Sequence, residues 1–234
     1  TIVLQTLAAN LGSMLTPIGN PQNLYLYNFY DMTMKDFLLT MAPVTALALM
    51  LIVISIFFIP NEPVAIDIDD DVVAIDHFKL IIYIVLFLLC LSTVLHWISY
   101  IVLFPIVILI ILLIDRKLFK RLDYMLLLTF CSFFVFIGNI GRIEWIKDML
   151  SAALYGREFL IGVVLSQVTS NVPAAILLSN FTNHAKELLL GVNIGSLGTL
   201  IASMASLISY KLYANTKHSN VKSYLLFFTF LNVL

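Results

Sequence analysis

Charged residues are scarce in this chain of 234 residues, because Asp, Glu, Lys and Arg together make up 12% of it. A soluble globular domain carries about 25%, so this chain has too little polar surface for a fold surrounded by water. Hydrophobic residues account for 61%, and the mean hydropathy is +1.02. These values indicate an all-α polytopic membrane protein in contact with a lipid bilayer. The net charge of −1 leaves no broad basic face, so no nucleic-acid partner is expected.

Cysteine and clustered catalytic residues are scarce as well. The two cysteines, Cys90 and Cys131, lie in apolar runs far apart in the sequence, and we expect them to be buried structural thiols. Acidic residues gather near His77, but in a polar loop, and His96, His184 and Glu187 are scattered. The sequence therefore predicts no enzyme, no metal centre and no cofactor.

Glycine and proline, 9 and 7 in number, gather in a few places. Residues 10–21, NLGSMLTPIGNP, lie in an apolar neighbourhood and contain two of each. Glycine and proline disfavour a continuous helix. A break at membrane depth frees backbone groups, which need other partners or a ligand. We therefore expect a broken helix over residues 1–30.

The same pattern returns 183 residues later. Residues 193–202, NIGSLGTLIA, repeat Asn, Gly, Ser, Thr and Ile in register with residues 10–19, which indicates an internal duplication. Between the copies, residues 167–173 interrupt an apolar stretch whose arms are too short to cross a bilayer. This pattern predicts a re-entrant hairpin with a polar tip, followed by a second broken helix, over residues 157–213.

The remaining chain divides by polarity. A single helix over the apolar residues 80–114 would be about 52 Å long, against a hydrocarbon core of about 30 Å, so two spans turning near residues 96–100 are expected. Aromatic residues at 24–30 are expected to form an interfacial belt. The other segments expected are a span (31–59), a polar acidic loop (60–79), three spans of a scaffold part (80–140), an interfacial amphipathic helix (141–156), and a basic loop with a truncated last span (214–234).

Basic residues at 115–123 and 211–222 favour the cytoplasmic side. Counting from them, four crossings separate the two copies, which then point in opposite directions. The predicted fold class is therefore an inverted-repeat secondary transporter with broken helices and a re-entrant hairpin. This step depends on two spans within residues 80–114.

Half-helix N-termini suit an anion, and freed carbonyls and hydroxyls suit Na⁺. No acidic residue occurs in the breaks or at the hairpin tip. The alternative is that the small residues only allow close helix packing. The candidate residues for substrate or ion binding are Asn10, Gly12, Ser13, Thr16, Pro17, Gly19, Asn20, Pro21, Ser170, Asn171, Pro173, Asn193, Gly195, Ser196, Gly198 and Thr199.

Residues 10–13 and 16–24 resemble the citrate-transporter-like and arsenite-permease-like branch of the ion transporter superfamily, which also contains sodium:dicarboxylate symporters and a class of Na⁺/H⁺ antiporters. Residues 170–173 resemble the Ser-Asn-Thr hairpin tip of the dicarboxylate symporters, with Val172 in place of the threonine. Residues 193–199 resemble the unwound helix of the second repeat. The resemblance implies a homodimer with a scaffold and a mobile transport part. It also implies that the hairpin of the first repeat lies upstream, so the chain is expected to be part of a longer protein.

The expected function is secondary active transport of a small anion such as a carboxylate or oxyanion, coupled to Na⁺ or H⁺, in a plasma (inner) membrane of the bacterial type. The alternatives are a Na⁺/H⁺ antiporter, an arsenite-efflux permease, a passive channel and a non-transporting scaffold fragment.

Overall fold

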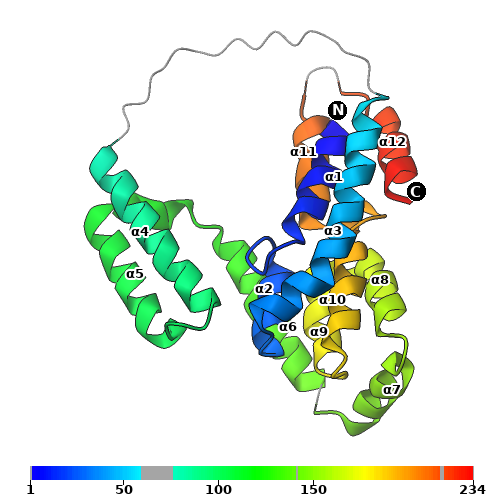
Figure 1. Cartoon of the computed structure of the whole chain (residues 1–234), viewed down its shortest axis with the longest axis horizontal. Coiled ribbons are helices and arrows are strands. Elements are labelled where there is room, and N and C mark those ends of the chain that lie inside the picture. Colours follow the sequence, from blue (N-terminus) through cyan, green and yellow to red (C-terminus); the bar gives the residue numbers. More distant parts are fainter. Residues whose placement is uncertain (1, 59–75, 141, 217–218, 234) are drawn as a thin grey trace. The chain divides into compact units, whose positions relative to one another are not determined.

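The computed structural model describes residues 2–58, 76–140, 142–216 and 219–233. Within these ranges the regular structure is helical, without a strand. The chain divides into two compact units (Figure 1). Unit 1 comprises Thr1–Ile59 and Thr129–Leu234, and unit 2 comprises Pro60–Leu128.

Most of the helices belong to unit 1. They are α1 (Ile2–Ser13), α2 (Pro21–Phe29), α3 (Met34–Ile56), α7 (Glu144–Leu154), α8 (Glu158–Thr169), α9 (Asn171–Ser179), α10 (Ala185–Ile194), the 3-10 helix η2 (Leu200–Ala202), α11 (Met204–Ala214) and α12 (Val221–Val233). Unit 2 contains α4 (His77–Val94), α5 (Tyr100–Ile114) and the 3-10 helix η1 (Arg116–Arg121). Helix α6 (Tyr124–Ile140) begins in unit 2 and continues in unit 1.

Two of the described helices, α3 and α4, are long and apolar enough to cross a membrane on their own. Helix α3 begins where the Thr33 hydroxyl accepts a hydrogen bond from the Asp36 amide at 3.1 Å, as in a standard N-cap. Many of its apolar side chains point outward, and Leu39, Leu49 and Met50 are each 60% exposed or more. Such a surface suits lipid rather than water.

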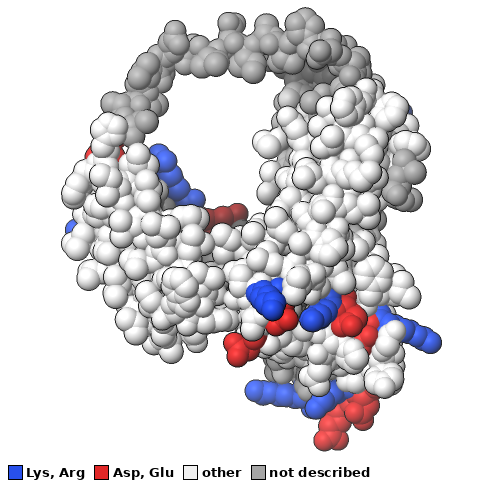
Figure 2. Space-filling model, in the orientation of Figure 1, with Lys and Arg blue, Asp and Glu red and all other residues white. Residues whose placement is uncertain are grey.

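The distribution of charge on unit 1 also suits a lipid environment. On the face shown in Figure 2, the surface over α1 and most of α3 is uncharged, and charged side chains gather at the end of unit 1 where α7 lies. The chain is therefore a polytopic helical membrane protein.

Helices α4 and α5 confirm that residues 80–114 form two short helices. The first ends at Val94, and Ser99 caps the second by accepting a hydrogen bond from the Ile101 amide at 3.3 Å. The Tyr83 hydroxyl, near the start of α4, donates to Asp115 Oδ2 at the end of α5 at 3.4 Å. The two helices therefore run antiparallel.

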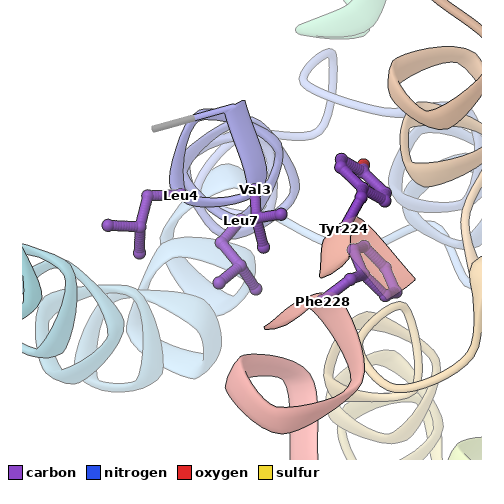
Figure 3. Close-up of a cluster of buried hydrophobic side chains, with 5 residues drawn as sticks. All are labelled: Val3, Leu4, Leu7, Tyr224 and Phe228. Carbon is purple, nitrogen blue, oxygen red and sulfur yellow. The ribbon is translucent and has the colours of Figure 1, made fainter. Parts of the chain in front are cut away.

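Two apolar clusters hold unit 1 together around its polar segments. The first joins α1 and α12 through Val3, Leu4, Leu7, Tyr224 and Phe228, and Figure 3 shows Val3 on the side of α1 that faces the two aromatic rings. The second joins α6 to α9 through Ile137, Val172 and Ile176. Burial of such side chains fixes the ends of the broken helices, and Leu197 and Leu200 of the second break pack against the first cluster.

Both cysteines differ from expectation. Cys90 on α4 and Cys131 on α6 are exposed on the outer surfaces of their helices. A thiol is small and weakly polar, so an apolar helix surface accommodates it as readily as a protein core does. The prediction of buried structural thiols was wrong.

The tyrosines near residues 24–30 do not form an outward-facing belt. Tyr27 is 2% exposed and packs edge-on against Phe37. The Tyr25 hydroxyl lies 3.0 Å from Ser179 Oγ, and the Tyr30 hydroxyl donates to the Thr182 carbonyl at 2.9 Å. Tyr25 and Tyr30 therefore join α2 to the end of α9, and Tyr27 packs against α3.

A helix forms within residues 141–156 as expected, at Glu144–Leu154, with Leu154 buried and Trp145 exposed. Its location at a membrane interface stays a prediction. The acidic loop at residues 60–79 lies outside the described residues except for its last four, where Asp76 caps α4.

Candidate functional site

The first break separates α1 from α2, as residues 10–21 predicted. Asn20 caps α2, because its Oδ1 accepts from the Asn23 amide at 2.9 Å, and Pro21 opens the helix where no amide hydrogen is needed. The freed carbonyls of Met14 and Thr16 accept from Asn23 Nδ2 at 3.1 and 3.3 Å. A buried side-chain amide thus replaces the missing helical hydrogen bonds.

The second break separates α10 from α11 and repeats this local chemistry. Ser196 Oγ donates to the Asn193 carbonyl at 2.6 Å, as Ser13 Oγ does to the Asn10 carbonyl at 2.9 Å. Ser203 caps α11 by accepting from the Ala205 amide at 3.2 Å.

The repeat also extends further than the sequence motif. Helix α2 starts at Pro21 and α11 at Met204, which are 183 residues apart, as are Asn10 and Asn193. The two N-cap residues, Asn20 and Ser203, have the same separation. Both copies therefore consist of a helix, a break and a capped second helix in the same register.

Two buried asparagines join the copies by matching pairs of hydrogen bonds. Asn193 Nδ2 donates to Asn23 Oδ1 at 2.6 Å, and Asn193 Oδ1 accepts from Asn20 Nδ2 at 3.2 Å.

The reciprocal pair starts from Asn10. Its Nδ2 donates to Ser206 Oγ at 3.2 Å, and its Oδ1 accepts from Ser203 Oγ at 2.8 Å. Ser203 and Ser206 stand 183 residues after Asn20 and Asn23. Each copy thus supplies one asparagine, and its partners are the capping residue and the third helical residue of the other copy.

Helices α8 and α9 form the expected helical hairpin. They meet at Ser170, whose φ of +75° lies in the left-handed region that side chains rarely adopt. At the other end, Thr182 Oγ1 donates to Glu158 Oε1 at 3.1 Å, which closes the base of the hairpin. Ser170 Oγ lies 3.5 Å from the Ala202 carbonyl, so the tip lies beside the second break. Entry of this hairpin into the membrane from one side stays a prediction.

A cavity of about 390 Å³ lies where both breaks meet the hairpin tip. Among the described residues that line it, none is charged. The starts of α2, α9 and α11 all border it. Its lining contains seven of the predicted site residues, namely Asn10, Ser13, Gly19, Asn20, Pro21, Asn171 and Ser196, together with Ala9, Gln22, Val172, Ser203, Met204 and Ala205.

The other predicted residues lie around this cavity or away from it. Asn193 and Gly195 are buried, and Asn193 reaches the cavity-lining Asn20 through its side chain. Gly12 has no neighbour within 4 Å of the position that a Cβ would take. The remaining predicted residues outside the lining are Thr16, Pro17, Ser170, Pro173, Gly198 and Thr199.

The candidate site residues did not include four polar residues of this network: Asn23, Gln167, Ser203 and Ser206. Of these, Asn23 and Gln167 lie within the motifs at residues 16–24 and 167–173. Extending the 183-residue offset past residue 202 would have placed Ser203 and Ser206 opposite Asn20 and Asn23. For Gln167 the only signal was a polar residue three positions before the hairpin tip.

The arrangement defines a class: a polytopic helical membrane protein in which two broken helices and a helical hairpin surround an uncharged polar cavity. The chain belongs to the citrate transporter family, whose model matches residues 2–207.

Two relatives show the extent of the likeness. An uncharacterized transporter of Methanocaldococcus jannaschii is 36% identical over 215 residues, which covers 90% of this chain and 57% of the relative. The inner membrane protein YbiR of Escherichia coli is 30% identical over 216 residues, 90% of this chain and 58% of that protein. The chain thus spans somewhat more than half the length of these relatives. No solved structure matches it.

Proposed function

We propose that the protein is a secondary active transporter of a small anion, such as a carboxylate or oxyanion, which binds in the cavity between the two breaks. The observation that carries this proposal is the convergence of three helix starts on one uncharged cavity. The N-terminus of a helix bears a partial positive charge and free amide hydrogens, both of which attract anions.

The chemistry of the lining supports an anion over a cation. Asn171 begins α9 without a side-chain cap, which leaves amide hydrogens of that helix available to a ligand. The side-chain amide of Asn10 borders the same space, and within the described part of the chain only one of its two N–H hydrogens is used, in the bond to Ser206. With no carboxylate in the lining, a bare cation would lack a counter-charge. The volume falls in the range of about 300–1,000 Å³ that is typical of small-molecule sites.

Contacts between the copies support an inverted repeat. Tyr30, just after the first copy, donates to the carbonyl of Thr182, just before the second. At the opposite end, Val3 at the start of the first copy lies in one cluster with Tyr213 at the end of the second. The copies therefore run antiparallel within unit 1, as is usual for secondary transporters with broken helices.

The coupling ion is proposed to be Na⁺ or H⁺, and the protein is proposed to work as a homodimer in a plasma (inner) membrane. Similarity to the inner membrane protein YbiR supports this choice of membrane.

The decisive experiment is uptake by the full-length protein in liposomes. Labelled citrate, smaller carboxylates, sulfate and arsenite are offered under inward Na⁺ or H⁺ gradients. We expect one class of anion to accumulate, and an ionophore that dissipates the driving gradient to abolish accumulation. Uptake that ignores both gradients for every anion would refute coupling, and uptake of none of them would refute the proposed function.

Ser196→Ala tests whether the cavity is the site. We expect uptake to fall at least tenfold while insertion into the membrane is retained, because the hydroxyl borders the cavity. Ser92→Ala in α4 is the matched control, since Ser92 Oγ also donates to a carbonyl three residues earlier, at 2.7 Å, but in unit 2. Equal uptake by both variants would exclude this cavity.

A further inference from the structure

The side chain of Gln167 lies inside the second break. This residue is on α8, three positions before Ser170 at the hairpin tip. Its Nε2 donates to the carbonyls of Gly195 at 2.9 Å and Leu197 at 2.7 Å. A side-chain amide has two N–H hydrogens, so these two short bonds use both of them, and the contact of Nε2 with the Val163 carbonyl of its own helix is longer, at 3.5 Å.

The rest of the amide is also engaged. Gln167 Oε1 accepts from the Thr199 amide at 2.9 Å, and the Gln167 carbonyl accepts from Thr199 Oγ1 at 2.9 Å. One residue of the hairpin therefore satisfies two carbonyls, one amide and one hydroxyl of the unwound segment.

Gly198 makes room for this side chain. Its φ of +109° is a conformation that favours glycine. A Cβ at this position would overlap Gln167 Oε1. Both features show that the backbone of the break is shaped around the amide of Gln167.

The same groups do not suit a cation. Carbonyls freed by a broken helix coordinate Na⁺ in many transporters, and hard cations need several oxygen ligands around one point. Here the carbonyls of Gly195 and Leu197 converge on a point that an N–H₂ group already occupies. Among the described residues no group of acidic or histidine side chains could hold a metal ion.

The first break is different in this respect. Its freed carbonyls, on Met14 and Thr16, accept from Asn23, which belongs to the same broken helix. Gln167 reaches its carbonyls from another element, the hairpin. The neutral side-chain amide of Gln167 thus binds the second break to the hairpin, at the position where a cation such as Na⁺ would be expected.

We infer that Gln167 replaces a coupling cation at the second break. Its amide group satisfies the freed carbonyls permanently, so this break binds no Na⁺, and any Na⁺ that drives transport binds elsewhere. That a cation drives transport rests on the proposed function, whereas the exclusion of Na⁺ from this break does not.

Thermal unfolding of the purified full-length protein tests the inference without measuring transport. The melting temperature is recorded in NaCl and in choline chloride of equal ionic strength, and the difference is the Na⁺-induced shift. We expect Gln167→Ala to show a shift equal to or larger than that of the wild type, because no Na⁺ ligand is lost.

Gln167→Glu should gain Na⁺ binding, since a carboxylate then lies beside the two carbonyls. At a Na⁺ concentration ten times its dissociation constant, we expect the shift to exceed that of the wild type by about 2–4 °C. Gln5→Glu is the matched control, because Gln5 is exposed on α1 and away from the break. It should leave the shift unchanged.

Two results would overturn the inference. One is a smaller Na⁺-induced shift in Gln167→Ala, which would make the glutamine a Na⁺ ligand. The other is a folded Gln167→Glu protein without any gain. If Gln167→Glu does not fold, Gln167→Ala decides alone. Failure of anion uptake by the wild type would refute the proposed function, but the melting temperatures would still decide the role of Gln167.

Discussion

At the scale of single residues, the crossed asparagines hold the two breaks together. Asn193 is 1% exposed and Asn10 is 7% exposed, and each bonds to two residues of the other copy. Hydrogen bonds between membrane helices contribute about 0.6 kcal/mol on average and at most about 1.7 kcal/mol.

Double-mutant cycles should therefore give similar values for the two reciprocal pairs. We expect a coupling free energy of about 0.6–1.7 kcal/mol between Asn193→Ala and Asn23→Ala, and one of similar size between Asn10→Ala and Ser206→Ala. Chemical unfolding in detergent measures both. Asn139→Ala is the control, because Asn139 is exposed and its Nδ2 donates only within its own helix, at 2.9 Å. Coupling in one cycle alone would contradict the symmetry of the network.

The two glycines of the first break should respond in opposite ways to alanine. A Cβ on Gly19 would overlap the Ser13 carbonyl oxygen, whereas one on Gly12 would meet nothing within 4 Å. We expect Gly19→Ala to lower the free energy of unfolding by about 1–3 kcal/mol. Gly12→Ala should leave it unchanged or raise it by up to about 1 kcal/mol, since alanine favours the helix. Equal destabilisation by both would contradict the close approach of Gly19 to the Ser13 carbonyl.

The residue types predicted where the helices break, but not which side chains form hydrogen bonds with the backbone and side chains at the breaks. Proline at 17 and 21 and glycine at 19 are incompatible with a continuous helix whatever surrounds them, so the first break followed from the sequence alone. The choice of Gln167 and Ser206 as partners depends on which helices lie side by side. That is a property of tertiary packing, to which a local pattern gives no access.

At the scale of elements, close contact between α8 and α10 keeps the hairpin next to the second break. A Cβ on Gly191 would lie 2.5 Å from the Phe159 carbonyl oxygen, and one on Gly162 would lie 3.2 Å from the Gly191 carbonyl carbon. Backbone contact of this kind is available only to glycine and other small residues.

Gly191→Ala should force these helices apart. We expect a loss of about 1–3 kcal/mol in unfolding free energy, together with reduced anion uptake because the hairpin tip shifts from the cavity. Gly138→Ala on α6 is the control, since a Cβ there meets nothing within 4 Å. Unchanged stability and uptake in Gly191→Ala would show that the two helices are not packed this closely.

The lengths of the helices could be predicted from the sequence, but the environment of the tyrosines could not. The thickness of the bilayer limits the length of a span, so residues 80–114 had to divide, and they do so between Val94 and Tyr100. Tyr25 and Tyr30 have the composition of an interfacial belt, yet their hydroxyls bond to Ser179 and Thr182. A tyrosine side chain has an apolar ring and a polar hydroxyl, which suit both a membrane interface and a contact between helices. Composition therefore could not separate these two environments.

At the scale of the whole molecule, the proposed inverted repeat makes a prediction about membrane sides. Lys35 follows the first copy, Lys186 lies at the start of the second, in the first turn of α10, and Lys222 follows the second copy; all three are exposed. Single cysteines at these positions are treated with a membrane-impermeant maleimide. We expect Lys35→Cys and Lys186→Cys to react from one side and Lys222→Cys from the other.

The background for this experiment is Cys90→Ser with Cys131→Ser. Both thiols are exposed, so their replacement leaves no cavity. Transport by the background protein checks that the fold is retained. Reaction of Lys35→Cys and Lys222→Cys from the same side would refute the inverted repeat.

The reciprocal asparagine bonds also bear on the origin of the fold. In an isologous contact, residue i of one partner touches residue j of the other and j touches i. Asn10 and Asn193 meet this condition within one chain, because their partners occupy corresponding positions, although these are serines on one side and asparagines on the other. A contact of this kind is self-complementary. A half-length ancestor carrying one such asparagine and its two polar partners could therefore have paired with a second molecule of itself before the two halves were fused.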